Sequence, residues 1–104
     1  MNNYDLIRDA VINKKQVVAV YNGYTREMCP HVLGLKNGRE QCLFYQFGGG
    51  SSSGVIVAGS IANWRCIPID KMQIVEIRIG VWHTASNHSS TQTCVDDIDV
   101  EVTF

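Results

Sequence analysis

Residues 17–47 read VVAVYNGYTREMCPHVLGLKNGREQCLFYQF, and this stretch predicts consecutive strands joined by tight turns. β-branched and aromatic side chains, which are typical of strands, fill residues 17–21. Asn22-Gly23 follows and is a strong signal for a two-residue hairpin turn. We therefore expect the chain to return antiparallel over 24–35.

Proline interrupts this second strand at Cys29-Pro30. Because proline cannot donate a backbone hydrogen bond, we expect the strand to lie at an edge or to carry a bulge there. Lys36-Asn37-Gly38 forms the next turn, and 41–47 is the third strand. The glycine- and serine-rich residues 48–54 are expected to form a flexible loop tip, followed over 55–58 by a short strand or by more of the same loop.

A short helix is predicted before these strands. Asn2 or Asn3 can cap its N-terminus, and Asp5 suits the positive end of the helix dipole. The apolar positions that follow have the spacing of one helical face: Leu6, Ile7, Ala10 and Val11.

The second half of the chain predicts further strands over 65–70 and 73–79, with a tight turn between them. Residues 98–104 alternate between apolar and polar side chains, as in an edge strand that pairs with this sheet or with a neighbour's. One helix followed by five or more short strands indicates a mainly β fold, a small barrel.

Composition limits the class of protein. The chain has 104 residues, of which 45% are hydrophobic and 18% charged, which fits one small globular domain and argues against disorder or a coiled coil. No apolar run approaches the roughly 20 residues of a membrane span. The cysteines stand singly with no CxxC pair, so we expect free thiols in a cytoplasmic protein: Cys29, Cys42, Cys66 and Cys94.

Charge is unevenly distributed along the chain. Residues 1–78 hold all nine basic residues and carry +3, whereas residues 79–104 hold four acidic residues and no basic one. This asymmetry suggests pairing between the acidic arm and a basic body, within one chain or between subunits. The overall charge of −1 argues against a large nucleic-acid footprint.

Two patterns in these strands resemble a known family. Tyr21-x4-Arg26-x3-Pro30-His31-x-Leu33 resembles the first signature of the WYL domain family, and Arg65-x-Ile67-x-Ile69-Asp70-Lys71-Met72 resembles its closing pattern. The Trp-Tyr-Leu segment of the family falls at Gln41-Cys42-Leu43, where only the leucine is kept, as in a divergent member. The match covers residues 4–79. It implies a WYL-like domain over 1–79 and a C-terminal extension over 80–104, which belongs to the same unit or to an oligomer interface.

The resemblance implies an Sm-like or SH3-like β-barrel with a leading helix. Members of this family usually follow a DNA-binding helix-turn-helix in bacterial regulators or belong to phage-defence systems. They sense nucleic acids or nucleotide-type ligands through arginine, tyrosine and histidine residues. Since there is no room for a helix-turn-helix before residue 16, we expect a free-standing sensor module.

The ligand-contacting arginines of the family fall at Arg26 and Arg65, and a guanidinium group suits phosphate or carboxylate. The other candidate ligand-binding residues are Tyr21, His31, Tyr45, Gln46, Gly49, Gly50 and Ser51. Two plainer interpretations remain open. Arg65 could pair with Asp70 or Glu76 on the surface, and the glycine residues could form only a hairpin tip.

Metal-ligating and nucleophilic residue types are also present. The zinc-ligand types are His83, His88, Cys94, Cys29 and His31, but their spacings match no compact zinc module, so we expect no metal and no cofactor. Cys29 or Cys94 beside a histidine could act as a thiolate nucleophile. Small barrels more often bury cysteine as a minor apolar residue, so we assign no catalytic residue.

These observations predict a non-enzymatic module that binds a small anionic ligand. The resemblance to the WYL family implies that this ligand is nucleotide-derived. A sensor without an effector domain could act by sequestration, for example as a phage protein that removes a bacterial immune signal. We also expect a homo-oligomer, a dimer or larger, and no membrane partner. Two alternatives stay open: a protein-interaction module that adds strand 98–104 to a partner's sheet, and a single-stranded nucleic-acid binder.

Overall fold

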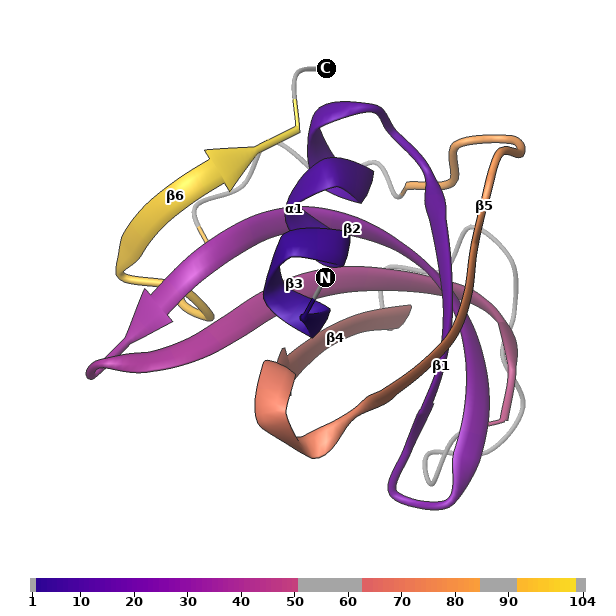
Figure 1. The fold of residues 1–104 in the computed structure, drawn as a ribbon, viewed down its shortest axis with the longest axis horizontal. Coiled ribbons are helices and arrows are strands. Elements are labelled where there is room, and N and C mark those ends of the chain that lie inside the picture. Colours follow the sequence, from indigo (N-terminus) through magenta and orange to yellow (C-terminus); the bar gives the residue numbers. More distant parts are fainter. Residues whose placement is uncertain (1, 51–62, 85–91, 103–104) are drawn as a thin grey trace.

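The computed structural model describes residues 2–50, 63–84 and 92–102 and has a mainly β fold with one N-terminal helix (Figure 1). The elements in chain order are α1 (Asn3–Ile12), β1 (Gln16–Tyr21), β2 (Tyr24–Lys36), β3 (Arg39–Gly49), β4 (Trp64–Pro68), the 3-10 turn η2 (Ile69–Lys71), β5 (Gln73–Arg78) and β6 (Asp97–Glu101). This confirms the predicted fold class. The undecided stretch 55–58 lies outside the described residues.

Local sequence signals set the helix start and the first two turns. The side chain of Asn2 caps α1 by accepting a hydrogen bond from the Asp5 N–H at 2.9 Å. In both hairpin turns the asparagine and the glycine have positive φ, at 51° and 79° in Asn22-Gly23 and at 52° and 79° in Asn37-Gly38. That combination is the type I′ turn, whose twist matches the flanking strands, so these turns fix the β1–β2–β3 meander.

The strands form one antiparallel sheet in the order β4-β3-β2-β1-β5, and β6 pairs with β2. The two end strands, β4 and β5, are separated in the chain only by η2 and Met72, so the sheet curls round on itself (Figure 1). A register shift between Pro30 and Val32 is the bulge predicted from the proline. β2 is longer than β1, and β6 pairs with the half of β2 that β1 leaves free.

The glycine-rich stretch departs from its predicted structure. Gly48 and Gly49 belong to β3, opposite Glu27 and Arg26, so the third strand continues two residues beyond 47. Gly49 has a φ of +82°, and a side chain there would overlap the backbone of Thr25 and Arg26. Glycine is therefore required here for close backbone approach to the neighbouring strand, rather than for a loose loop.

One face of the sheet carries the main core and is covered by α1, and we call it the helix face (Figure 1). The helix contributes Ile7, Ala10 and Val11 to this core. The strands and η2 contribute mainly Val17, Ala19, Met28, Leu33, Cys42, Phe44, Ile67 and Ile69. Ile7, Ala10 and Val11 repeat at helical spacing because this side of α1 packs on the sheet, as the sequence predicted.

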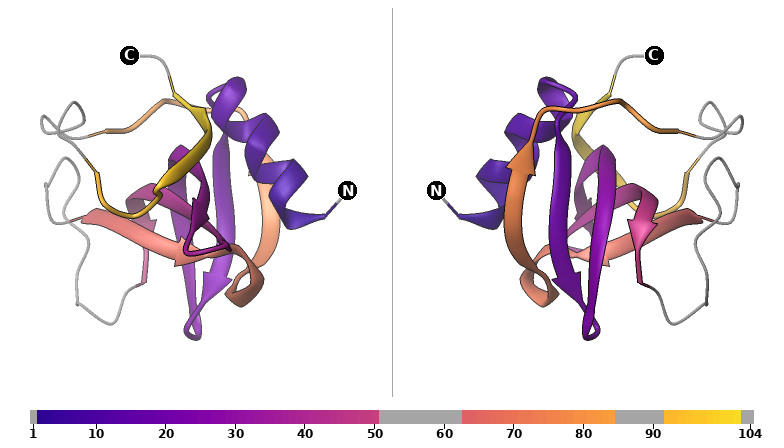
Figure 2. Two further views of the ribbon diagram at one scale, coloured as in Figure 1. Left: turned by 90° about the vertical axis from the view of Figure 1, so that its left-hand side faces the viewer. Right: turned by 90° about the vertical axis from the view of Figure 1, so that its right-hand side faces the viewer.

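The opposite face, which we call the outer face, is covered by the C-terminal extension. Cys94 and Val95 pack there on Val32 and Leu43 as a second small core. The segment after β5 starts beside α1 and runs over that end of the sheet to the side opposite α1 (Figure 2). Its His83 N–H donates to the Cys29 sulfur at 3.3 Å. The described parts of 80–102 thus pack directly against the barrel strands. Among the described residues, no helix has the length and apolar character needed to cross a bilayer.

Candidate anion-binding site

Arg26 lies on the helix face at the end of the sheet nearest the β1–β2 turn. Its cross-strand neighbours are Ala19, a core residue on β1, and Gly49 on β3. Directly opposed residues in an antiparallel pair share a face, so the Arg26 side chain points to the same side as the core. Only 3% of the residue is exposed, which is unusual for an arginine.

The described contacts of the Arg26 guanidinium are neutral groups. Nε donates to the Tyr21 carbonyl oxygen at 3.3 Å, and Nη1 donates to Gln46 Oε1 at 3.2 Å. The rings of Tyr21 and Tyr24 lie 5.2 and 5.6 Å from Cζ, within cation–π range. Nη2 makes no hydrogen bond to a described residue, so donors remain for another group.

No carboxylate of a described residue balances the charge of Arg26. None of the ion pairs between described residues includes Arg26. Its pKa is lowered first by burial and then by the positive charge of Arg65. Arginine stays protonated even so, because its ordinary pKa lies far above neutral pH. Burying a cation beside a second cation is costly without a counter-ion, so this end of the sheet favours an anion.

Gln46 fixes the arrangement of the Arg26 guanidinium and the glycine residues. The side chain of Gln46 is fully buried, and its Nε2 donates to the carbonyl oxygens of Gly48 and Gly50 at 2.9 and 2.8 Å. These bonds turn Oε1 towards Arg26, so the amide orientation follows from the hydrogen bonds. The Gly50 N–H donates to the Thr25 carbonyl oxygen at 3.0 Å, so it is not free to hold an anion, contrary to the expectation for this residue.

Arg65 lies on β4 opposite Phe44, a core residue of the helix face. Phe44 and Gln46 are two residues apart on β3 and therefore share a face, as period-two alternation requires. Arg65 is partly exposed, and its Nη1 donates to the Trp64 carbonyl oxygen at 3.1 Å. The described ion pairs do not join it to Asp70 or to Glu76, whose carboxylate lies 3.8 Å from Arg78.

Four predicted site residues thus come together on one face: Tyr21, Arg26, Gln46 and Arg65. Gly49 pairs with Arg26, Gly50 is tied to Gln46, and Ser51 lies outside the described residues. Sequence reasoning did not place Tyr24 at the site. The hairpin register could have done so, because Tyr24 is directly opposite Tyr21 across the Asn-Gly turn.

His31 and Tyr45 do not join this site, and their placement is a correction. Tyr45 precedes Gln46 on β3, so its side chain lies on the outer face. There it contacts Trp64 at a ring-centroid distance of 5.1 Å and His31 at 6.4 Å. The bulge after Pro30 places His31 in the same aromatic cluster. Adjacent residues of a regular strand point to opposite faces of the sheet, so Tyr45 and Gln46 do not share one site. This could have been predicted from the sequence alone.

The imidazole of His31 holds the C-terminal extension against the outer face. One ring nitrogen, Nδ1, is bonded to the Cys29 carbonyl oxygen at 2.8 Å, and Nε2 to Thr84 Oγ1 at 3.0 Å. The rings of Trp64 and Trp82 lie 4.7 and 4.9 Å away. Since His31 is 1% exposed and both ring nitrogens are used, its role here is structural.

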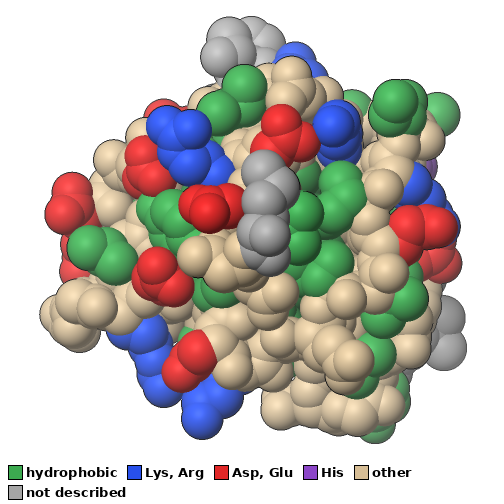
Figure 3. Space-filling model, in the orientation of Figure 1, with side chains coloured by type: hydrophobic (Ala, Val, Ile, Leu, Met, Phe, Trp, Pro, Cys, Tyr) green, Lys and Arg blue, Asp and Glu red, His purple; other side chains and the backbone are tan. Residues whose placement is uncertain are grey.

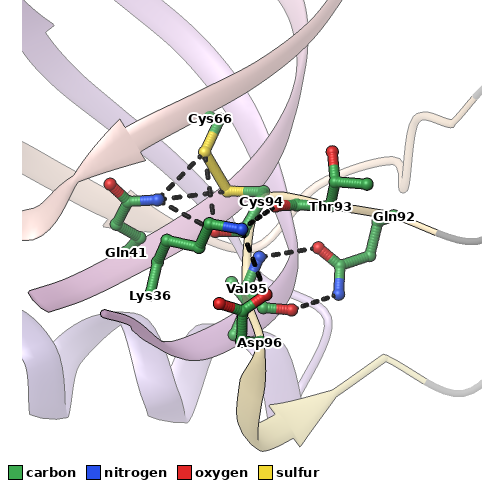
Figure 4. A network of polar contacts seen from close by, with 8 residues as sticks. All are labelled: Lys36, Gln41, Cys66, Gln92, Thr93, Cys94, Val95 and Asp96. Carbon is green, nitrogen blue, oxygen red and sulfur yellow. Dashed lines mark hydrogen bonds and ion pairs between the residues drawn. A yellow bond between two sulfur atoms is a disulfide. The ribbon is translucent and has the colours of Figure 1, made fainter. Parts of the chain in front are cut away.

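The free-thiol prediction is wrong for two of the four cysteines. Cys66 on β4 and Cys94 before β6 form a disulfide with a Cα–Cα distance of 5.6 Å (Figure 4). The Gln41 amide donates to the Cys94 carbonyl oxygen at 2.9 Å beside it. Spacing could not reveal this bridge, because it depends on the irregular extension folding back over the outer face.

The remaining cysteines are buried and free. Burial raises the pKa of the Cys29 thiol to about 11, against which the hydrogen bond from His83 is a smaller, opposing effect. The pKa of Cys42 is also raised well above its ordinary value, again by burial. Both thiols therefore stay protonated near neutral pH, which disfavours the thiolate nucleophile considered for Cys29.

Within the ranges that the structure describes, histidine, cysteine, aspartate and glutamate do not gather into a metal site. His88, one of the candidate ligand types, lies outside those ranges. Comparison of the chain with protein-family models, with curated proteins and with solved structures finds no match. The resemblance to the WYL family therefore remains a prediction from the two sequence patterns.

Proposed function

We propose that this chain is a non-enzymatic binding module that takes a small anionic ligand of the nucleotide class at Arg26 and Arg65. The observation that carries the proposal is the buried Arg26 guanidinium, which has a second arginine nearby and no carboxylate among its contacts with described residues. A phosphate oxygen is the natural partner for its remaining donors. The two tyrosine rings beside it provide flat apolar surface for a base.

The nucleotide class rests on the sequence resemblance, whereas the anionic character rests on the site itself. A single compact ligand fits the net charge of −1 better than a nucleic-acid polymer does. Such a site suits sequestration of a signalling nucleotide, as in a phage protein that removes an immune signal. Strand addition through β6 is less well supported, because β6 already pairs with β2 in its own chain.

The first experiment is a thermal-shift screen of linear and cyclic nucleotides, followed by calorimetry with the best ligand. Arg65→Gln removes one charge-assisted contact from a partly exposed position. Such contacts contribute about 1.5–3 kcal/mol, so affinity should fall roughly 10- to 150-fold. Arg26→Gln should weaken binding at least as much, with its fold checked by circular dichroism.

Arg39→Gln is the matched control, because Arg39 is an exposed arginine at the start of β3. It removes the same charge and should leave affinity within about twofold, since exposed charges act weakly at a distance. A screen with no ligand, or equal losses for Arg39→Gln and Arg65→Gln, would show that the arginines do not form the site.

A further inference from the structure

The outer edge of β5 is a second feature without an assigned partner. β5 pairs with β1 on one side, and no other described strand pairs with it. Its backbone edge is flanked by exposed apolar side chains, with Val75 at 61%, Ile79 at 89% and Val81 at 71%. Figure 3 shows hydrophobic side chains on the surface at the upper right, where Figure 1 places the end of β5. Open strand edges of this kind favour pairing with another chain.

We propose that two copies of this chain form a symmetric dimer by antiparallel pairing of their β5 strands about Ile77. The stretch 75–79, VEIRI, is complementary to itself in this register. Val75 lies opposite Ile79 of the second copy, and Glu76 lies opposite Arg78 of the second copy. Each of these two pairs occurs twice, as two-fold symmetry requires.

The faces of β5 are consistent with this pairing. Ile77 lies opposite the core residue Val17 and so faces the helix side of the sheet. Glu76 and Arg78 lie opposite Val18 and Gln16 and face the outer side. In the dimer the two Ile77 side chains would therefore continue the helix face across both sheets, and the ion pairs would lie on the outer, solvent side.

Neighbouring registers are disfavoured by charge. A slip of two residues in one direction places Glu76 opposite Glu76 of the second copy, and in the other direction it places Arg78 opposite Arg78. Like charges directly opposite each other destabilise a strand pair. A slip of one residue places each charged side chain opposite an apolar one and reverses the faces. Charge and apolar pattern therefore select the same register.

Arg78 is held by contacts within its own chain on the inner side of β5. Its Nε donates to Gln16 Oε1 at 2.7 Å, and its Nη2 donates to Glu27 Oε2. Its Nη1 lies 3.8 Å from Glu76 Oε1 of the same chain, too far for a hydrogen bond. These two bonds direct the guanidinium towards β1 and β2, so Glu76 of the second copy would have to reach across β5 to Nη1, the nitrogen that makes no hydrogen bond to a described residue.

The dimer should depend on concentration. The register of β1 and β5 shifts between Val18 and Ala19, so Val75 is the extra residue of a bulge. Regular backbone pairing is therefore limited to the residues that follow it, and Val75 would meet Ile79 of the second copy through its side chain alone. A short strand edge buries less than the standard interface of about 1,600 Å². We therefore expect monomer and dimer to exchange in the micromolar range, measured by sedimentation velocity over a wide concentration series.

A charge-swap experiment tests the register. Glu76→Arg alone should shift the equilibrium to monomer at least tenfold in concentration, because four positive groups then meet at the interface. Arg78→Glu, made with Glu27→Gln so that the new carboxylate does not face its own Glu27, should do the same. Mixing the two proteins should restore a 1:1 heterodimer, since every pair is then complementary.

Ile79→Lys is a second test of the interface. It places a charge at an exposed position, where folding is not at risk, and it should also give monomer. Its matched control is Ile98→Lys on β6, a 45% exposed isoleucine far from β5 in the sheet order, which should leave the dimer unchanged. A wild-type protein that stays monomeric throughout the series overturns the proposal. A dimer that survives Ile79→Lys, or variants that fail to pair on mixing, overturns it equally.

Discussion

Removal of the Cys66–Cys94 disulfide should lower the free energy of unfolding by about 3.6 kcal/mol. The bridge joins residues 28 positions apart. Closing a loop of that length removes about 12 cal/mol/K of chain entropy from the unfolded state, which gives this value at 25 °C. The loss is large beside the 5–15 kcal/mol that typically separates folded from unfolded chains. The variant Cys66→Ser/Cys94→Ser should still fold, but with a small margin.

Other contacts explain why the extension should stay in place without the bridge. Lys36 Nζ bonds to the Thr93 carbonyl oxygen and to Asp96 Oδ1, both at 3.1 Å (Figure 4). The side chain of Gln92 bonds to the Val95 N–H and carbonyl oxygen at 2.8 and 2.7 Å. β6 remains paired with β2 as well. We therefore expect lower stability with an unchanged far-ultraviolet circular dichroism spectrum.

Urea unfolding of the wild type with and without reductant is the assay. With an m-value of about 1–3 kcal/mol/M, the midpoint should fall by roughly 1–4 M on reduction. The serine variant is the control. Its midpoint should equal that of the reduced wild type and should not change when reductant is added. Thiol titration in denaturant should count two groups per chain before reduction and four after it. Four groups before reduction, or a midpoint that reductant does not move, would refute the bridge.

Two further predictions concern the C-terminal strand. The pKa of Asp99 is lowered mainly by the hydrogen bond from the Tyr4 hydroxyl at 2.5 Å, with help from Arg8 at 3.3 Å. A carboxylate whose folded pKa lies below the unfolded value of about 3.9 stabilises the fold above that pH, and the contribution is lost as pH falls. The free energy of unfolding should therefore fall less between pH 5 and pH 2.5 in Asp99→Asn than in the wild type. An equal fall in both proteins would contradict this. Gly34→Ala should displace β6, because a Cβ there would overlap the Asp97 carbonyl oxygen and come within 2.7 Å of the Val95 side chain. We expect a loss of about 1–3 kcal/mol in urea unfolding and faster hydrogen exchange of the Asp96 and Val102 amides, and unchanged exchange would show that β6 adapts.

The parts of the fold that were predictable are those set by short-range signals. Asn22-Gly23 and Asn37-Gly38 are residue pairs that tolerate positive φ, and the type I′ hairpin turn requires positive φ at both of its central positions. Pro30 lacks an N–H, and the bulge follows from it. Asn2 can cap α1 because only its near neighbours are involved.

The features that were missed depend on contacts between distant segments. The Cys66–Cys94 bridge joins segments whose approach no local pattern encodes. For the same reason the sequence left open whether strand 98–104 pairs with this sheet, as β6 does with β2, or with a neighbour's. At the site, the sequence could predict that Arg26 and Gln46 belong together. Arg26 lies in a pattern that resembles the family, and Gln46 is one of the candidate residues named with it. The inclusion of Tyr45 was an avoidable error, since alternation along β3 already places adjacent side chains on opposite faces.

The contact between Asp99 and the first helix has a consequence for how the protein is made. Tyr4 and Arg8 in α1 meet Asp99 in β6 across 95 and 91 positions of sequence. A ribosome releases the chain in order, so α1 and half of β2 emerge long before the strand that covers them. During synthesis that half of β2 is an open edge, available to chaperones or to other nascent chains. Docking of α1 on β6 can be completed only after residue 101 has left the exit tunnel.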